Sequence, residues 1–175
     1  AAFEALKNND IDAVTAALVK MPDLAEANVY TEYFALFVRN LVRFVDDGVL
    51  IQPAVRVKEE PFGCLIHQEL DGRYKIFTGF AGPEWAMAAF ASRYAKMDVV
   101  GMDEVARDAL GEFMNVQNGL FLSKLSNDWV ELELVPSEFK RDGSLVSIGV
   151  VYKIPFTLPF GEFTFFIGLG SPVFN

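Results

Sequence analysis

Strand-like segments come in two groups, and within each group turn sequences, not helices, join the neighbours. The first group comprises residues 54–60, 63–70 and 73–81, and the second comprises residues 129–136, 144–156 and 162–169. LDGR at 70–73 and KRDGS at 140–144 are typical of tight turns between antiparallel strands. This grouping favours an antiparallel sheet over a doubly wound parallel one.

Three segments have the apolar period of helices, namely residues 31–45, 83–97 and 104–125. Pro83 suits the first turn of the second helix, and Asp103 is placed to cap the third. The predicted order is helix, three strands, two helices, three strands. We therefore expect an α+β fold with long helices packed on antiparallel sheet. Both halves read as a long helix followed by three strands, which makes an internal pseudo-duplication a hypothesis.

Residues 1–30 fall outside this pattern. They predict an N-terminal helical appendage or linker of two short helices, and residues 31–175 then form the main domain. The start of the chain has neither the basic region nor the apolar stretch of a signal peptide, although it also has no initiator Met. No apolar run approaches the roughly 18 residues that a membrane helix needs.

Composition argues against several classes of function. A net charge of −9, with no basic cluster, is unsuited to binding phosphates, so nucleic acid is a poor partner. Cys64 is the single cysteine, which rules out an internal disulfide. The single histidine, His67, lies three positions later in a predicted strand and so points to the opposite face. We therefore expect no metal site and no Cys–His nucleophile.

The helix at 104–125 carries the candidate site. On a helical wheel, its apolar face comprises Val105, Ala109, Phe113, Val116 and Leu120, widened by Ala106, Leu110, Gln117 and Phe121. Four other residues share one outward strip, which we call the signature ridge: Asp108, Glu112, Asn115 and Gly119. Gly119 keeps one end of the ridge low, so the ridge could enter a cleft of another protein. An ordinary solvated helix face is the alternative interpretation.

The ridge reads D-x3-E-x2-N-x3-G and resembles the signature helix of the CheC/CheX/FliY family of chemotaxis phosphatases. The order of elements over residues 31–170 is also similar to that of CheX-like members. CheC has two such helices, whereas here the first long helix has Phe37 and Asn40 at the equivalent positions and lacks the Glu. With one complete signature, the chain resembles a CheX-like member.

The resemblance implies a cytoplasmic bacterial phosphatase that hydrolyses the aspartyl phosphate of a CheY-type response regulator, in chemotaxis or another two-component pathway. Glu112 and Asn115 are then the catalytic residues: Asn115 orients the attacking water, and Glu112 docks on the regulator by pairing with its lysine. Asp108 and Gly119 contact the partner. The divalent metal belongs to the regulator, the chain has no cofactor of its own, and CheX relatives suggest a homodimer.

Two other functions stay open at this stage. The same fold could be a non-catalytic adaptor that binds a response regulator or a flagellar motor protein. It could also be a ligand-binding domain that uses the glycine turn at residues 79–82, which joins a predicted strand to a predicted helix. A pocket at that turn would favour the ligand domain, whereas an accessible ridge would favour the first two functions.

Overall fold

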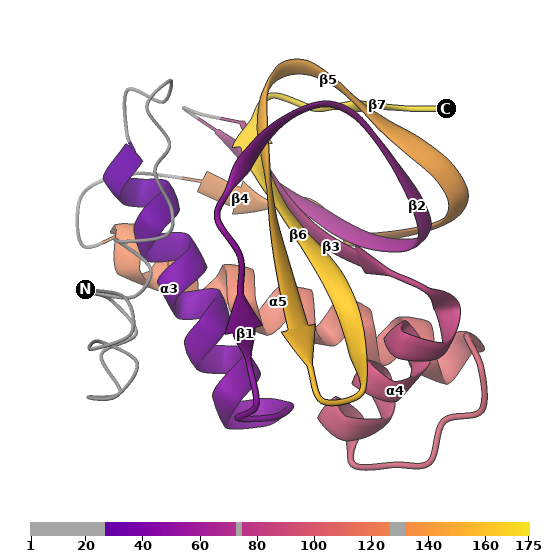
Figure 1. Cartoon of the computed structure of the whole chain (residues 1–175). Coiled ribbons are helices and arrows are strands. Elements are labelled where there is room, and N and C mark those ends of the chain that lie inside the picture. The colour runs from indigo at the N-terminus through magenta and orange to yellow at the C-terminus, as the bar shows by residue number, and fades with distance from the viewer. Residues whose placement is uncertain (1–26, 73–74, 127–131) are drawn as a thin grey trace.

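The computed structural model describes residues 27–72, 75–126 and 132–175 (Figure 1). The helical appendage predicted for the N-terminus lies almost wholly outside these residues. Helix α3 (Ala27–Phe44) begins earlier than the sequence predicts, so residues 27–30 belong to it.

The other two predicted helices are confirmed as α4 (Glu84–Ala95) and α5 (Glu104–Ser126). Pro83 directly precedes α4, where its missing N–H costs nothing. Asp103 caps α5, because its Oδ1 accepts a hydrogen bond of 2.8 Å from the backbone N–H of Ala106. These local signals place the start of both helices correctly.

Antiparallel pairing joins all the described strands, which confirms the α+β class. Their bounds are β1 (Leu50–Ile51), β2 (Val55–Gly72), β3 (Ile76–Gly82), β4 (Leu132–Leu134), β5 (Glu138–Leu158), β6 (Gly161–Leu169) and β7 (Val173–Phe174). The order is β1-β5-β6-β3-β2-β4, and β7 pairs with β5. The predicted hairpin between β2 and β3 is confirmed by the pairing of Leu70 with Ile76.

The sheet also closes on itself. Strand β5 pairs with β6, β6 with β3, β3 with β2, and β2 again with β5, and we call this closed path the strand circuit. In Figure 1, β2 and β5 arch together over the rest of the sheet. Their register runs from Val55 opposite Lys153 to His67 opposite Glu138, with a shift between Val57 and Glu59 that marks a β-bulge or irregularity.

The predicted turn at KRDGS is wrong, because β5 runs through it without a break. Asp142 adopts the left-handed conformation, with φ 45°, so the turn-forming residues alter the strand locally and do not end it. Strand β2 likewise spans both segments that the sequence separates at Pro61. A proline is tolerated there because β3 pairs with β2 only from Cys64 onward, so Pro61 has a neighbouring strand on one side alone.

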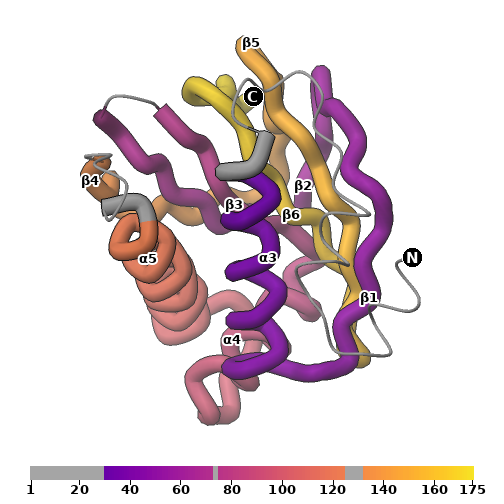
Figure 2. The backbone as a smooth tube through the Cα atoms, turned by 90° about the vertical axis from the view of Figure 1, so that its left-hand side faces the viewer, coloured from indigo at the N-terminus to yellow at the C-terminus, as the bar shows by residue number. Residues whose placement is uncertain are grey.

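Two hydrophobic cores lie on opposite faces of the sheet. The larger lies between the sheet and the helices, where the rings of Phe37 of α3 and Phe165 of β6 are tilted against each other with 4.3 Å between their centroids. Figure 2 shows α3 and α5 side by side against the sheet. The smaller core fills the strand circuit and comprises Val57, Phe62, Leu65, Phe77, Ala81, Leu145, Val151 and Phe166.

Cys64 and His67 point to opposite sides of β2, as predicted. Cys64 packs in the helix-side core, whereas His67 stacks with Phe174 at 4.8 Å and with Phe77 at 5.4 Å between ring centroids. The geometry therefore prevents the two side chains from meeting at one site.

Candidate functional site

Helix α5 packs with its buried stripe turned slightly from the predicted one. Phe113, Leu110 and Phe121 are buried as expected, but Val105 and Leu120 are about half exposed, at 48% and 46%. Two residues not assigned to the core take their place, Met114 and Asn118, both fully buried. The stripe is shifted because α5 packs against α3 as well as against the sheet. Polar side chains of α3 donate hydrogen bonds to Asn118 and Gln117 on this side of α5.

The signature ridge faces outward. Asp108, Glu112 and Asn115 are exposed. Gly119 is half-buried, yet a Cβ atom added to it would meet nothing within 4 Å. The predicted accessibility of Glu112 and Asn115 is therefore confirmed, while the roles assigned to the four residues stay predictions.

The ridge borders a shallow hollow of about 380 Å³ between α5, β2 and the start of β5. Its lining comprises Ile66, Arg107, Asp108, Gly111, Glu112, Asn115, Ser137 and Phe139. Gly111 lets the chain come close here, because a Cβ at this position would lie 2.9 Å from the Ser137 hydroxyl oxygen. Sequence reasoning did not associate Arg107 or Ser137 with this site.

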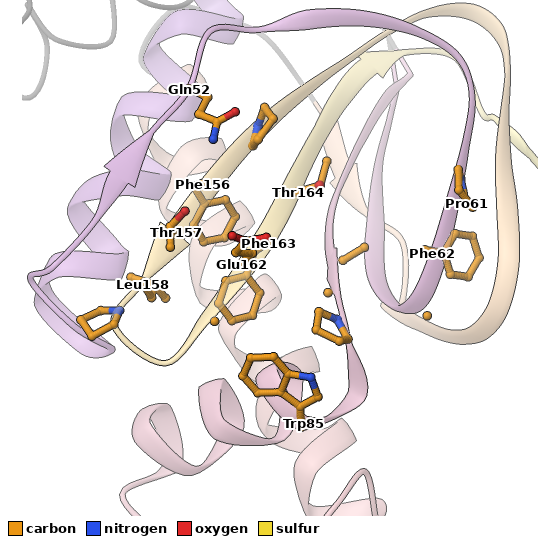
Figure 3. Close-up of a pocket in the computed structure, with 17 residues that line it drawn as sticks. Gln52, Pro61, Phe62, Trp85, Phe156, Thr157, Leu158, Glu162, Phe163 and Thr164 are labelled. Carbon is orange, nitrogen blue, oxygen red and sulfur yellow. The ribbon is translucent and has the colours of Figure 1, made fainter.

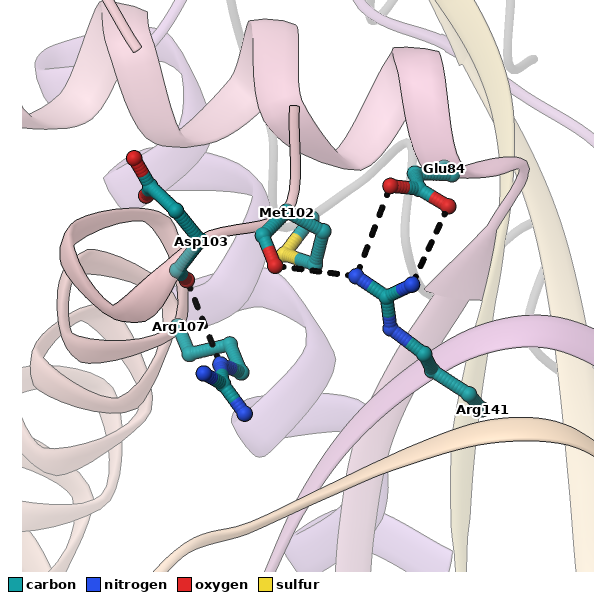
Figure 4. Close-up of polar contacts among 5 residues, drawn as sticks. All are labelled: Glu84, Met102, Asp103, Arg107 and Arg141. Carbon is teal, nitrogen blue, oxygen red and sulfur yellow. Dashed lines mark hydrogen bonds and ion pairs between the residues drawn. The ribbon is translucent and has the colours of Figure 1, made fainter. Parts of the chain in front are cut away.

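The beginning of α5 is held by two arginines, as Figure 4 shows. Arg141 of β5 donates to the backbone carbonyl of Met102 at 2.9 Å and pairs with Glu84 of α4 at 3.4 Å. Arg107 donates from Nε to the carbonyl of Asp103 at 3.2 Å. These contacts tie the residues before α5 to both α4 and the sheet, so the helix carrying the ridge has a fixed starting point.

Glu112 also lies close to α4. Burial first, and the charge of Glu112 second, raise the pKa of the Tyr94 phenol. The Glu112 carboxylate itself is exposed, so it is available to a cation on a partner.

Asn115 is exposed but held from behind. Its Oδ1 accepts a hydrogen bond of 2.8 Å from Nε2 of Gln68 on β2, and the same Nε2 also donates to the carbonyl of Val135 at 2.8 Å. Gln68 is buried and was missed from the sequence. A signal existed, since Gln68 occupies the alternating positions whose other members, Ile66 and Leu70, belong to the core.

A second polar pair links α3 to α5. Asn40 donates to Gln117 at 2.6 Å, and both side chains are buried. The Asn of the first long helix is thus enclosed between helices, so it offers no second accessible ridge.

The glycine turn at 79–82 does border a groove, of about 800 Å³ (Figure 3). Apolar and proline side chains dominate the labelled part of its wall, with Trp85, Phe163 and Phe62 prominent. Its carboxylate, Glu162, is exposed, and so is Gln52. A groove at this turn is the feature that the ligand-domain interpretation predicts, and polar side chains of Gln52, Thr157 and Glu162 contribute to its lining. The ligand-domain interpretation therefore stays open beside the two functions that the accessible ridge favours.

Among the described residues, no group of three or more His, Cys, Asp or Glu side chains is placed to hold a metal ion. No helix in that part of the chain is long and apolar enough to cross a membrane.

Known proteins resemble this chain in three-dimensional structure, whereas comparison of sequences finds no match. No family model matches the chain, and no curated protein matches its sequence. A CheC-like superfamily protein from Shewanella sp. PV-4 aligns with a TM-score of 0.70 at 14% identity, over 82% of this chain and 97% of that one. CheX from Desulfovibrio desulfuricans aligns with a TM-score of 0.69 at 16% identity, over 82% and 99%.

A third similar structure is a complex. CheX from Borrelia burgdorferi, solved together with CheY, BeF3 and Mg2+, aligns with a TM-score of 0.64 at 13% identity, over 82% of this chain and 98% of that one. Identities this low establish the fold alone. The chain therefore has the fold of the CheC-like and CheX chemotaxis proteins.

Proposed function

We propose that this protein hydrolyses the aspartyl phosphate of a CheY-type response regulator. The observation that carries the proposal is the exposure of Glu112 and Asn115 together, one turn apart, on a helix whose ridge is open at Gly119. The fold supports it, and so does the structure of a CheX with its CheY among the similar proteins.

The reaction needs orientation more than chemistry from this chain. Water attacks the phosphorus in line, the new O–P bond forms as the P–O bond to the aspartate carboxylate breaks, and the water proton passes to solvent or to the phosphate that leaves. Asn115 holds the water opposite the departing carboxylate. The attacking water is therefore already in the in-line geometry and need not reach it by random encounter.

Glu112 acts in docking. A carboxylate repels a phosphoryl group, so it does not approach the reacting centre, but it can pair with a lysine of the regulator and so set the register of the helix. The divalent metal that neutralises phosphoryl charge belongs to the regulator. This division of roles predicts different kinetic effects for the two residues.

The test is the rate of phosphate loss from a phosphorylated CheY-type regulator of the same cell. Asn115→Ala is expected to lower kcat about 100-fold with KM nearly unchanged, because orientation is lost and docking kept. Glu112→Ala is expected to raise KM, most strongly at low salt. Thermal unfolding of Glu112→Ala should match that of the wild type, since the Glu112 side chain is exposed. Asn115→Ala should stay folded and unfold at a slightly lower temperature, because the buried Gln68 amide loses one acceptor.

The control is Glu162→Ala, which removes an exposed carboxylate from the other groove. It should leave both constants unchanged. Binding of the regulator without acceleration by the wild type would refute the enzyme and identify the adaptor instead. Unfolding of Asn115→Ala would mean that the helix face has been assigned wrongly.

A further inference from the structure

A chain of hydrogen bonds runs from the core to Asn115. Gln68 of β2 contacts Asn115, Asn118 of α5 donates from Nδ2 to Oε1 of Gln68 at 2.7 Å, and the Tyr33 hydroxyl of α3 donates to Oδ1 of Asn118. Apart from Asn115, these residues are at most 2% exposed. Three elements therefore combine to hold one exposed amide.

We propose that Gln68 is a positioning residue, which fixes the carboxamide of Asn115 with its Nδ2 atom facing the partner. The inference rests on the proposed function, because it specifies how Asn115 is prepared for a water or a phosphoryl oxygen. Gln68 itself is buried and reaches the reaction only through Asn115.

A backbone carbonyl decides which way Gln68 is turned. The carbonyl of Val135 can only accept, so the group of Gln68 that lies 2.8 Å from it must be the amide nitrogen Nε2. The same nitrogen then faces Asn115 and has to find an acceptor there, which is Oδ1. The orientation of Gln68 is thus set by chemistry that cannot be reversed.

A second backbone carbonyl supports the same polarity. The Thr78 hydroxyl donates to the carbonyl of Gln68 at 2.9 Å, so its oxygen is left to accept from Asn118 Nδ2 at 3.3 Å. Asn118 must therefore present Nδ2 to Gln68 as well, and Gln68 must meet it with Oε1. Both ends of the network require the same arrangement of the Gln68 amide.

The consequence falls on Asn115. With Oδ1 held by Gln68, Nδ2 forms no hydrogen bond with any described residue. The amide offers two N–H donors and the second lone pair of Oδ1 to the hollow. Two N–H donors of fixed direction suit a water oxygen or a phosphoryl oxygen. The Asn115 carboxamide is oriented before the partner binds.

The first experiment needs no variant. Side-chain 15N relaxation of the wild type should give the Asn115 carboxamide an order parameter near the rigid range of about 0.85, while the exposed Gln52 amide should fall below about 0.6. An Asn115 amide as mobile as that of Gln52 would overturn the proposal.

The second experiment compares two identical substitutions. Gln68→Met removes the group that holds Asn115. Gln117→Met removes a buried glutamine of α5 that bonds to Asn40 and to the backbone carbonyl of Tyr33, and not to Asn115. With phosphorylated regulator, Gln68→Met should lower kcat between about 10- and 100-fold and leave KM unchanged, while Gln117→Met should keep kcat within about two-fold. Equal kcat values for the two variants would contradict the positioning role.

The relaxation data separate this inference from the proposed function. If the wild type does not accelerate dephosphorylation, but its Asn115 amide is rigid and becomes mobile in Gln68→Met, the positioning role holds and the phosphatase fails. If the wild type is active and Gln68→Met leaves the amide rigid, the phosphatase holds and the positioning role fails.

Discussion

At the scale of single residues, the two glycines of α5 have different surroundings. Gly119 has open space where a Cβ would stand, whereas at Gly111 a Cβ would lie 2.9 Å from the Ser137 hydroxyl. Glycine inside a helix costs roughly 1 kcal/mol relative to alanine, and that cost brings no gain in packing at Gly119. We interpret this glycine as a requirement of the surface that meets a partner.

The glycines give a paired prediction. Gly119→Ala should raise the free energy of unfolding by about 0.5–1 kcal/mol, measured by urea titration, because helix propensity improves and nothing clashes. Gly111→Ala should gain less or lose stability, since Ser137 must move. Gly119→Trp should fold normally yet raise KM for the regulator. Equal stability changes at the two glycines, or an unchanged KM for the Trp variant, would contradict this interpretation.

Residue patterns predict the outward ridge well and the polar network poorly. The ridge follows from a periodicity within one helix, which a sequence displays directly. The contact between Gln68 and Asn115 joins residues from different elements, and so does that between Tyr33 and Asn118. Which buried polar groups meet depends on how helices settle on the sheet, and no local spacing encodes that.

At the scale of elements, β2 carries a buried histidine. Burial lowers the pKa of His67 from 6.5 to about 4, and the nearby Glu138 carboxylate opposes this only in part. Within the described residues neither ring nitrogen has a hydrogen-bond partner, and Glu138 lies 3.8 Å from Nε2. The neutral imidazole is therefore packed as an aromatic ring against Phe77 and Phe174.

The lowered pKa of His67 predicts that the free energy of unfolding falls over a defined range of acidic pH. Between pH 6.5 and about 4 the unfolded chain binds a proton at this imidazole and the folded chain does not, so stability is complete above pH 6.5 and is lost as the pH falls. The loss from this group amounts to at most about 3 kcal/mol. His67→Phe should abolish it and keep the ring stacking, as urea titrations at pH 7 and pH 4.5 can measure.

The neighbouring carboxylate provides a second variant. Because the Glu138 carboxylate partly opposes the lowering of the His67 pKa, Glu138→Gln should lower that pKa further and should not reduce the acid sensitivity between pH 6.5 and about 4. If His67→Phe loses as much stability as the wild type between pH 7 and 4.5, the buried histidine is not the acid-sensitive group.

Some ends of helices and strands are set by residues at that point of the chain, and others are set by pairing with a distant strand. Pro83 and Asp103 act on their own helices, so both starts are predicted correctly. The turn chemistry of KRDGS is equally clear in sequence, yet β5 continues because β2 pairs with it on both sides of Asp142. Pairing across the sheet overrides a local preference, and the partner strand is not visible from the turn itself.

At the scale of the whole molecule, Phe37 joins the helix layer to the sheet. It is fully buried, and its ring contacts Phe165 and Phe156 of the sheet and Phe113 of α5. Phe37→Ala should lower the free energy of unfolding by about 3–5 kcal/mol, because the cavity opens where the layers meet and cannot collapse locally.

Denaturant titration checks this prediction. Val42→Ala, on the exposed side of the same helix, is the matched control and should change stability by no more than about 0.5 kcal/mol. A Phe37→Ala variant nearly as stable as that control would mean that the aromatic cluster does not join the layers.

The strand circuit has a consequence for how fast the molecule reaches its native state. Its closing contacts pair Val55 with Lys153 and His67 with Glu138, so segments about 70 to 100 residues apart in the sequence must meet before β2 and β5 can bond. Each such pairing loses loop-closure entropy before the contacts between the strands can stabilise it. We expect refolding on the timescale of milliseconds to seconds, with the circuit completed late, although each helix can form within microseconds.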